Sequence, residues 1–180
     1  MLSPMKVAPS LVHRLFYPQV PLVMAAKAGG MTSAMPVVSY LSVSENPPIV
    51  AVACTPRGFT CRLARRSHCF SLSVLDREEA SALSKLATIS GAAVKDKLAQ
   101  AGLAHSDGAK LKVPVLDAAV ATLECRLLST SRLGDHLLLV ASVEAAYTER
   151  GFSGFWDYRN YRPILYAGWQ EGELSQYTGP

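Results

Sequence analysis

The amino-acid sequence predicts a mainly β (α+β) protein in which short helices are inserted between the strands of a compact barrel. Short apolar or alternating segments recur along most of the 180 residues, with turn-forming residues between them. The helical segments are too short to be the crossover helices of a doubly wound α/β sheet. With 49% hydrophobic residues and no internal repeat, the chain can bury a core as a single domain.

The strands are predicted from apolar runs, from alternation, and from the glycines and prolines that end them. The first strand ends at a Gly29-Gly30 turn. Pro36 argues against a central strand in the next segment, because proline has no N–H to donate to a neighbour. After residue 136 both strand faces are mostly apolar, which suits a barrel stave covered on its outer side. The predicted strands are 20–28, 31–44, 49–54, 70–76, 120–129 and 136–147, then 162–166, with at most one edge strand in 105–117.

Three short helices are predicted between these strands. Thr55 as N-cap and Pro56 at the first helical position predict a helix over 57–66. Asp76 with Glu79 resembles a capping box, followed by an apolar helical face that ends near Gly91. Residues 92–101 form the third helix, which stops at Gly102.

Composition excludes several classes of function. The net charge is only +4, and the densest basic segment, 62–69, is too short for a nucleic-acid interface. No stretch reaches the ~20 apolar residues of a membrane span, and the N-terminus lacks the pattern of a signal peptide. The four cysteines show no metal-ligand spacing, so we expect free, mostly buried thiols and no metal site. We therefore expect a cytoplasmic protein.

The stretch from Thr55 to Thr60 carries the chemistry that is easiest to interpret. A buried strand runs directly into a predicted helix N-terminus, whose free amides and partial positive charge favour a phosphate group. Arg57 adds a guanidinium group that can donate two hydrogen bonds at once, and the hydroxyls of Thr55 and Thr60 add neutral donors. Gly58 allows close approach of the backbone. An ordinary capped helix with an exposed arginine is the alternative. The small residues of "TSAM", just upstream, offer a surface on which a flat ring could lie.

An ordered series of motifs over about residues 18–147 resembles the flavin reductase-like, FMN-binding split-barrel family. The series consists of "GGMTSAMPVVSYLSVSENPPIVAVA", "TPRGFT", "CFSLSVL", "KDKL", "PVLDAAVATLECRL" and "GDHLLLVASVEAAY". Three positions depart from the family pattern: Ser33 stands where asparagine is common, Ser73 where another asparagine is frequent, and Leu98 where an aromatic is usual. These departures affect side-chain contacts more than backbone contacts.

The resemblance implies a homodimer of Greek-key split barrels with one flavin per subunit, FMN or alternatively FAD. It assigns the phosphate to Thr55, Pro56, Arg57 and Thr60, with added charge from Lys97. His136 would face a nicotinamide of NADH or NADPH, although a histidine that opens a strand is more often a surface residue. Lys97 could equally belong to a solvated helix face. The implied ring contacts are Thr32, Ser33, Ala34, Met35, Ser39 and Cys54.

The implied function is that of an NAD(P)H:flavin oxidoreductase, such as a ferric-chelate reductase or the reductase of a two-component monooxygenase. An FMN-binding electron-transfer protein that does not oxidise NAD(P)H is the alternative. A third hypothesis is a plain β-barrel interaction module. No Gly-x-Gly-x-x-Gly motif is present, so a nicotinamide dinucleotide would have to bind in the flavin cleft itself. The domain prediction is a core of about 16–150 and an aromatic segment, 151–180, that closes the barrel or the dimer interface.

Overall fold

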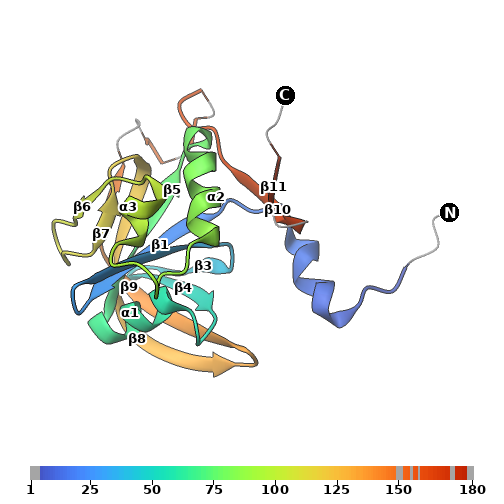
Figure 1. Cartoon of the computed structure of the whole chain (residues 1–180), viewed down its shortest axis with the longest axis horizontal. Coiled ribbons are helices and arrows are strands. Elements are labelled where there is room, and N and C mark those ends of the chain that lie inside the picture. The colour runs from blue at the N-terminus through green and yellow to red at the C-terminus, as the bar shows by residue number, and fades with distance from the viewer. Residues whose placement is uncertain (1–4, 149–151, 155, 158, 171–172, 178–180) are drawn as a thin grey trace.

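The centre of the molecule is a seven-stranded antiparallel sheet with strand order β2-β1-β5-β8-β9-β4-β3 (Figure 1). The computed structural model describes residues 5–148, 152–154, 156–157, 159–170 and 173–177. The sheet consists of β1 (Leu22–Ala28), β2 (Met31–Val37), β3 (Tyr40–Glu45), β4 (Pro48–Cys54), β5 (Cys69–Leu75), β8 (Ala119–Leu133) and β9 (His136–Thr148). The predicted mainly β architecture is confirmed.

Short helices and two small hairpins complete the fold. The helices are α1 (Phe59–Ser67), α2 (Ala80–Thr88) and α3 (Lys97–Ala101), with 3-10 helices η1 (Pro9–Phe16) and η2 (Arg77–Glu79). The hairpins pair β6 (His105–Asp107) with β7 (Pro114–Leu116), and β10 (Leu165–Gln170) with β11 (Glu173–Tyr177). Among the described residues, no helix has both the length and the apolar character needed to cross a membrane.

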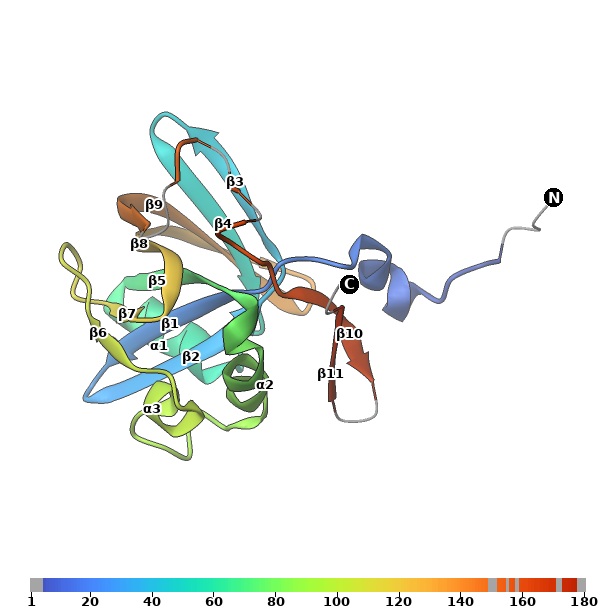
Figure 2. The same cartoon turned by 90° about the horizontal axis from the view of Figure 1, so that it is seen from above.

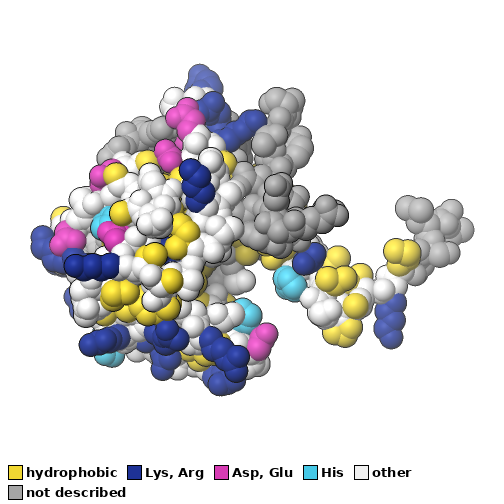
Figure 3. Space-filling model, in the orientation of Figure 1, with side chains coloured by type: hydrophobic (Ala, Val, Ile, Leu, Met, Phe, Trp, Pro, Cys, Tyr) yellow, Lys and Arg dark blue, Asp and Glu magenta, His cyan; other side chains and the backbone are white. Residues whose placement is uncertain are grey.

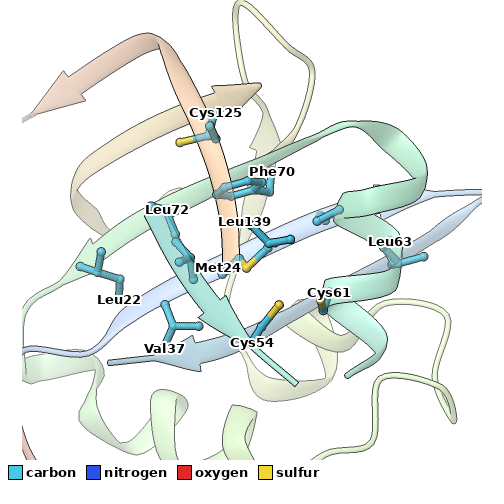
Figure 4. Packing of buried hydrophobic residues seen from close by; sticks show 14 of the residues in the cluster. Leu22, Met24, Val37, Cys54, Cys61, Leu63, Phe70, Leu72, Cys125 and Leu139 are labelled. Atoms are coloured by element: carbon cyan, nitrogen blue, oxygen red, sulfur yellow. The ribbon is translucent and has the colours of Figure 1, made fainter. Parts of the chain in front are cut away.

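The sheet curls into a barrel that stays open, with β2 and β3 as its two edge strands. β2 also comes close to β4 but does not pair with it. Side chains alternate along β1, so that Met24 is buried inside the barrel while Val23 and Ala25 are buried on its outer side. Figure 4 shows the interior core, to which α1 contributes from one end. Helices α2 and α3 cover the outer side, as the apolar strand faces require.

The β1–β2 hairpin confirms two predictions from the sequence. Gly29 and Gly30 form its turn with φ of +59° and +74°, values that favour glycine. β2 is an edge strand of the sheet, as Pro36 predicted. Its register places Pro36 opposite Val23. β2 carries the TSAM residues along one open side of the sheet.

Two helices begin at other residues than predicted. Asp76 does act as a cap, but it accepts a hydrogen bond from the Glu78 N–H (3.3 Å) and opens the 3-10 turn η2 before α2 begins. The third helix is shorter than predicted and starts at residue 97. Its cap is Asp96, which accepts a hydrogen bond from the Ala99 N–H at 3.1 Å. Gly102 ends this helix with φ +84°, as predicted.

The prediction that Thr55 caps α1 is wrong. The Gly58 N–H donates to the Thr55 carbonyl at 3.0 Å, so residues 55–58 close a β-turn before the helix begins. Pro56 occupies the second position of that turn, where its φ is equally suitable. Gly58 is the N-cap, with no side-chain hydrogen bond, and α1 starts at Phe59.

Three other boundaries also differ. Residues 105–117 contain two short paired strands, not one. β8 extends to Leu133, which leaves only Gly134 and Asp135 for the turn into β9. The last predicted strand begins at Leu165, three residues later than expected, and pairs with β11.

The β10–β11 hairpin lies beside the N-terminal segment (Figure 2), while Ile164, just before this hairpin, is buried against the outer side of the barrel. Gln19 and Tyr166 exchange two backbone hydrogen bonds, at 3.1 and 2.8 Å. Of the predicted aromatic cluster, Trp156 packs on Tyr161 with ring centroids 4.7 Å apart. Tyr158 and the Trp169 side chain lie outside the described residues. Whether the C-terminal segment closes a dimer interface stays a prediction.

Candidate functional site

A cleft of about 760 Å³ opens where the end of β2, the end of β4 and the start of β9 meet. Five of the residues predicted from the sequence line it: Met35, Ser39, Cys54, Thr55 and His136. These residues are far apart in the chain, and the curl of the sheet brings them together. The cleft is therefore a product of the barrel.

The outer edge of β2 presents backbone groups next to this cleft. The Thr32 N–H points away from β1 and donates to the Lys95 carbonyl at 2.9 Å. Because backbone directions alternate along a strand, the Ala34 N–H points to the same side. Among the described residues, only Asp96 forms a bridge with this edge, and it does so at Thr32. The Ala34 amide therefore faces away from β1, but the whole residue is 0% exposed.

The side chains of Ser33 and Thr60 are buried beneath that edge. Their hydroxyl oxygens are 2.9 Å apart, and the two residues are 0% and 2% exposed. This hydrogen bond fastens β2 to the first turn of α1. Ala34 is also fully buried. Ser33 and Ala34 are therefore covered along their backbone as well as their side chains, while the Thr60 N–H lies in the first turn of α1.

The turn at residues 55–58 combines a free cation with free amides. Thr55 and Arg57 are exposed, and no carboxylate among the described residues pairs with the Arg57 guanidinium. The first N–H groups of α1 have no acceptor within the helix. Arg62 lies over the Phe59 ring, 5.2 Å from its centre, and donates to the Arg57 carbonyl. An anion bound here would meet both a guanidinium and a helix N-terminus.

Lys97 occupies a second cavity of about 310 Å³ that shares Met35 and Pro36 with the cleft. Lys97 is only 6% exposed, which contradicts the alternative that it belongs to a solvated helix face. Burial lowers the pKa of its ammonium group. Among the described residues, no hydrogen bond or ion pair engages this group. A buried amine without a partner is costly, so a ligand that supplies an acceptor would be bound favourably.

His136 opens β9 at the mouth of the cleft and is partly exposed. Its Nδ1 lies 2.8 Å from Asp135 Oδ1. The imidazole holds the pKa of Asp135 below its usual range. This contact orients the ring and leaves Nε2 available to a molecule in the cleft.

The N-terminal segment contributes residues that the sequence analysis did not single out. Pro9, Ser10, His13 and Tyr17 line the same cleft. Tyr166 lines the second cavity and meets Tyr17 edge-to-face, with ring centroids 4.9 Å apart. Residues 11, 12, 15 and 16 are apolar at helical spacing, which could have indicated η1. No pattern in the chain places that helix at the cleft.

Comparison with known proteins was made with this geometry in hand. An uncharacterised protein of Aeropyrum pernix is 32% identical over 158 residues, covering 87% of this chain; the chain spans 60% of that protein's length. A flavin reductase of Pseudomonas putida is 30% identical, with 76% of both chains covered.

A solved structure shares both the fold and part of the sequence. The FMN-binding protein of Thermus thermophilus with bound 1-cyclohex-2-enone superposes with a TM-score of 0.79 and 28% identity, covering 98% of this chain and 96% of that one. The split-barrel fold predicted from the motifs is thereby confirmed. The model of the flavin reductase like domain matches residues 13–166. The chain belongs to the flavin reductase-like family.

Proposed function

We propose that this protein is an NAD(P)H-dependent flavin oxidoreductase that holds FMN in the cleft between β2, β4 and β9. The observation that carries the proposal is a cleft lined by Met35 and Thr55, with an exposed Arg57 on the turn that begins at Thr55 and a buried Lys97 in an adjoining cavity that shares Met35 with the cleft. Their chemistry suits a flat, hydrogen-bonding ring joined to a phosphate. The names of the Pseudomonas and Thermus relatives agree with it.

The residues present fit such a cofactor. The β2 edge and the Met35 side chain offer a surface for the ring, and the 55–60 loop offers donors for the phosphate. Lys97 lines the adjoining cavity together with Met35 and Pro36 of the same strand. The proposed cofactor-binding residues are Thr32, Ser33, Ala34, Met35, Ser39, Cys54, Thr55, Pro56, Arg57, Thr60 and Lys97. FAD would need room for its second nucleotide beyond this loop.

When bound, FMN supplies a two-electron acceptor for the hydride of a nicotinamide. The protein's own part is to bind and to orient. The Lys97 ammonium group would stabilise negative charge on a ring bound against β2. His136, oriented by Asp135, offers Nε2 to the nicotinamide at the cleft mouth. Hydride transfer needs no general base from the protein.

The proposal is tested by titrating the purified protein with FMN and then adding NADH or NADPH without air. We expect the flavin absorption bands to shift on binding and to bleach with one of the two nucleotides. FMN that binds but stays oxidised would favour the electron-transfer alternative. A protein that binds no flavin would overturn both.

The same assay separates binding from reduction through His136. We expect His136→Ala to bind FMN as the wild type does but to bleach about tenfold more slowly, the effect of one lost hydrogen bond. The control is His68→Asn, an exposed histidine at the end of α1 whose φ of +56° asparagine tolerates. Equal bleaching rates for His136→Ala and the wild type would remove His136 from the reaction.

A further inference from the structure

Cys54 and Cys61 flank the 55–60 loop in the sequence and contact each other in the fold. Cys54 ends β4, and Cys61 lies in the first turn of α1. Both belong to the interior core, and Figure 4 shows the two side chains next to each other. The Cys54 thiol donates a hydrogen bond to the Cys61 sulfur. Both are free thiols.

The two sulfurs differ in access and in protonation. Cys54 lines the cleft, whereas Cys61 is fully buried behind it. The hydrogen bond from Cys54 holds the pKa of Cys61 below its usual value despite burial, and the Arg65 guanidinium acts in the same direction. That same hydrogen bond, together with burial, raises the pKa of Cys54.

Cys54 lines the cleft, so a thiolate formed on Cys54 is the one that a small molecule in the cleft can reach. A thiolate, not a thiol, reacts with peroxides.

The other two cysteines lack this arrangement. Cys125 is fully buried, and burial together with Glu124 raises its pKa to about 12. The Cys69 thiol donates to the Ser67 carbonyl at 3.3 Å. They serve as internal references for any oxidation experiment.

We propose that Cys54 and Cys61 form a peroxide-sensitive thiol pair that closes into an intramolecular disulfide across the 55–60 loop. The Cys54 thiolate attacks one oxygen of hydrogen peroxide, so an S–O bond forms, the O–O bond breaks, and hydroxide leaves to become water. The Cys61 sulfur then attacks the Cys54 sulfur. The S–S bond forms, the S–O bond breaks, and hydroxide leaves with the last thiol proton. Two thiols and one peroxide give one disulfide and two waters.

The position of this disulfide suggests its consequence, which rests on the proposed function. The bond would pull the end of β4 toward the first turn of α1 and so displace the donors of the loop between them. We expect the affinity for FMN to fall about tenfold, as for the loss of one charge-assisted hydrogen bond. Peroxide is an oxidant that a flavin reductase meets in air, because dioxygen accepts electrons from reduced flavin.

Peptide mapping tests the bond directly and does not depend on flavin. Trypsin cleaves after Arg57 and Arg62, so Cys54 and Cys61 fall in separate peptides, 28–57 and 58–62. The reduced protein is treated with hydrogen peroxide, its remaining thiols are alkylated, and the digest is analysed without reductant. We expect the two peptides to be joined, with Cys69 and Cys125 alkylated. Unlinked peptides, or Cys54 linked to another cysteine, would overturn the proposal.

Variants define the order of events. In Cys61→Ser, we expect Cys54 to accumulate as a sulfenic acid that dimedone traps; in Cys125→Ser, the bond should form as in the wild type. If Cys61 of the Cys54→Ser variant is oxidised and labelled by dimedone as fast as the wild-type protein is oxidised, the assigned order is wrong.

FMN titration of the oxidised protein, before and after dithiothreitol, tests the consequence of the disulfide for FMN binding. Unchanged affinity would overturn the regulatory step alone, and a linked protein that never binds FMN would overturn the proposed function but not the disulfide.

Discussion

The exposed position of the Arg57 side chain is set by the four-residue turn at 55–58. The turn at 55–58 holds it exposed beside the first turn of α1, and among the described residues no carboxylate neutralises it. Gly58 makes the turn tight: a Cβ there would lie 3.2 Å from both the Thr55 carbonyl oxygen and its hydroxyl. The cation is therefore positioned by its backbone and not by a partner side chain.

We predict that Arg57→Ala weakens FMN binding by about 1.5–3 kcal/mol, or roughly ten- to a hundredfold in Kd, because a charge-assisted hydrogen bond to the phosphate is lost. Fluorescence titration with FMN measures the change. Arg77→Ala, which removes an exposed arginine from η2, is the matched control and should bind like the wild type. An unchanged Kd for Arg57→Ala would argue against phosphate at this turn. Riboflavin, which lacks the phosphate, should bind both variants alike.

At the scale of elements, the loop between β6 and β7 is held on the barrel by one carboxylate. Glu124 of β8 is fully buried and accepts hydrogen bonds from the N–H groups of Lys110 (3.1 Å) and Leu111 and from the Tyr147 hydroxyl (2.7 Å). Gly108 packs against it so closely that a Cβ would lie 2.5 Å from the carboxyl carbon. Burial by itself raises the pKa of Glu124, but these hydrogen bonds outweigh it and hold the pKa below its ordinary value.

We predict that Glu124→Gln lowers the free energy of unfolding at neutral pH by about 1.5–3 kcal/mol, because the amide turns a donor toward other donors. A carboxyl whose pKa is depressed on folding stabilises the protein above its unfolded pKa and loses that effect as the pH falls through the folded value. The difference between wild type and variant should therefore shrink in acid. Urea unfolding followed by circular dichroism at several pH values measures it. Glu45→Gln, an exposed glutamate at the end of β3, is the control. A constant difference across pH would exclude this ionic role.

At the scale of the whole molecule, exposed apolar side chains gather on the projecting N-terminal segment (Figure 3). Leu11, Val12, Leu15 and Phe16 of η1 are 43–70% exposed, and no residue of that helix is buried. The edge strand β3 adds Leu41 and Val43. An apolar helix face left exposed in this way is unfavourable in an isolated chain.

We therefore expect a homodimer in which η1 packs on the second copy. Light scattering after size exclusion should give twice the mass of the chain, and Phe16→Ser should shift the population toward monomer. Lys6→Ser changes an exposed residue on the same segment and should leave the dimer intact. A wild-type monomer at micromolar concentration would contradict the expectation.

By itself the sequence determined most of what depends on neighbouring residues. Alternation located β5 and β9, Gly29-Gly30 located the first turn, and Pro36 identified β2 as an edge strand, since each of these signals is local. It failed where one local pattern allows two structures: Thr-Pro-Arg-Gly serves equally as a capped helix start or as a β-turn. The structure has the turn at 55–58, and α1 begins after it at Phe59.

Only the tertiary structure decided the composition of the site. Burial of Lys97, the place of η1 beside the cleft, and the contact between Cys54 and Cys61 all follow from the curl of the sheet, which brings separate segments together. Periodicity reports which face of a strand or helix is apolar. It does not report which distant element will cover that face, because that depends on how the strands pair and how the barrel closes.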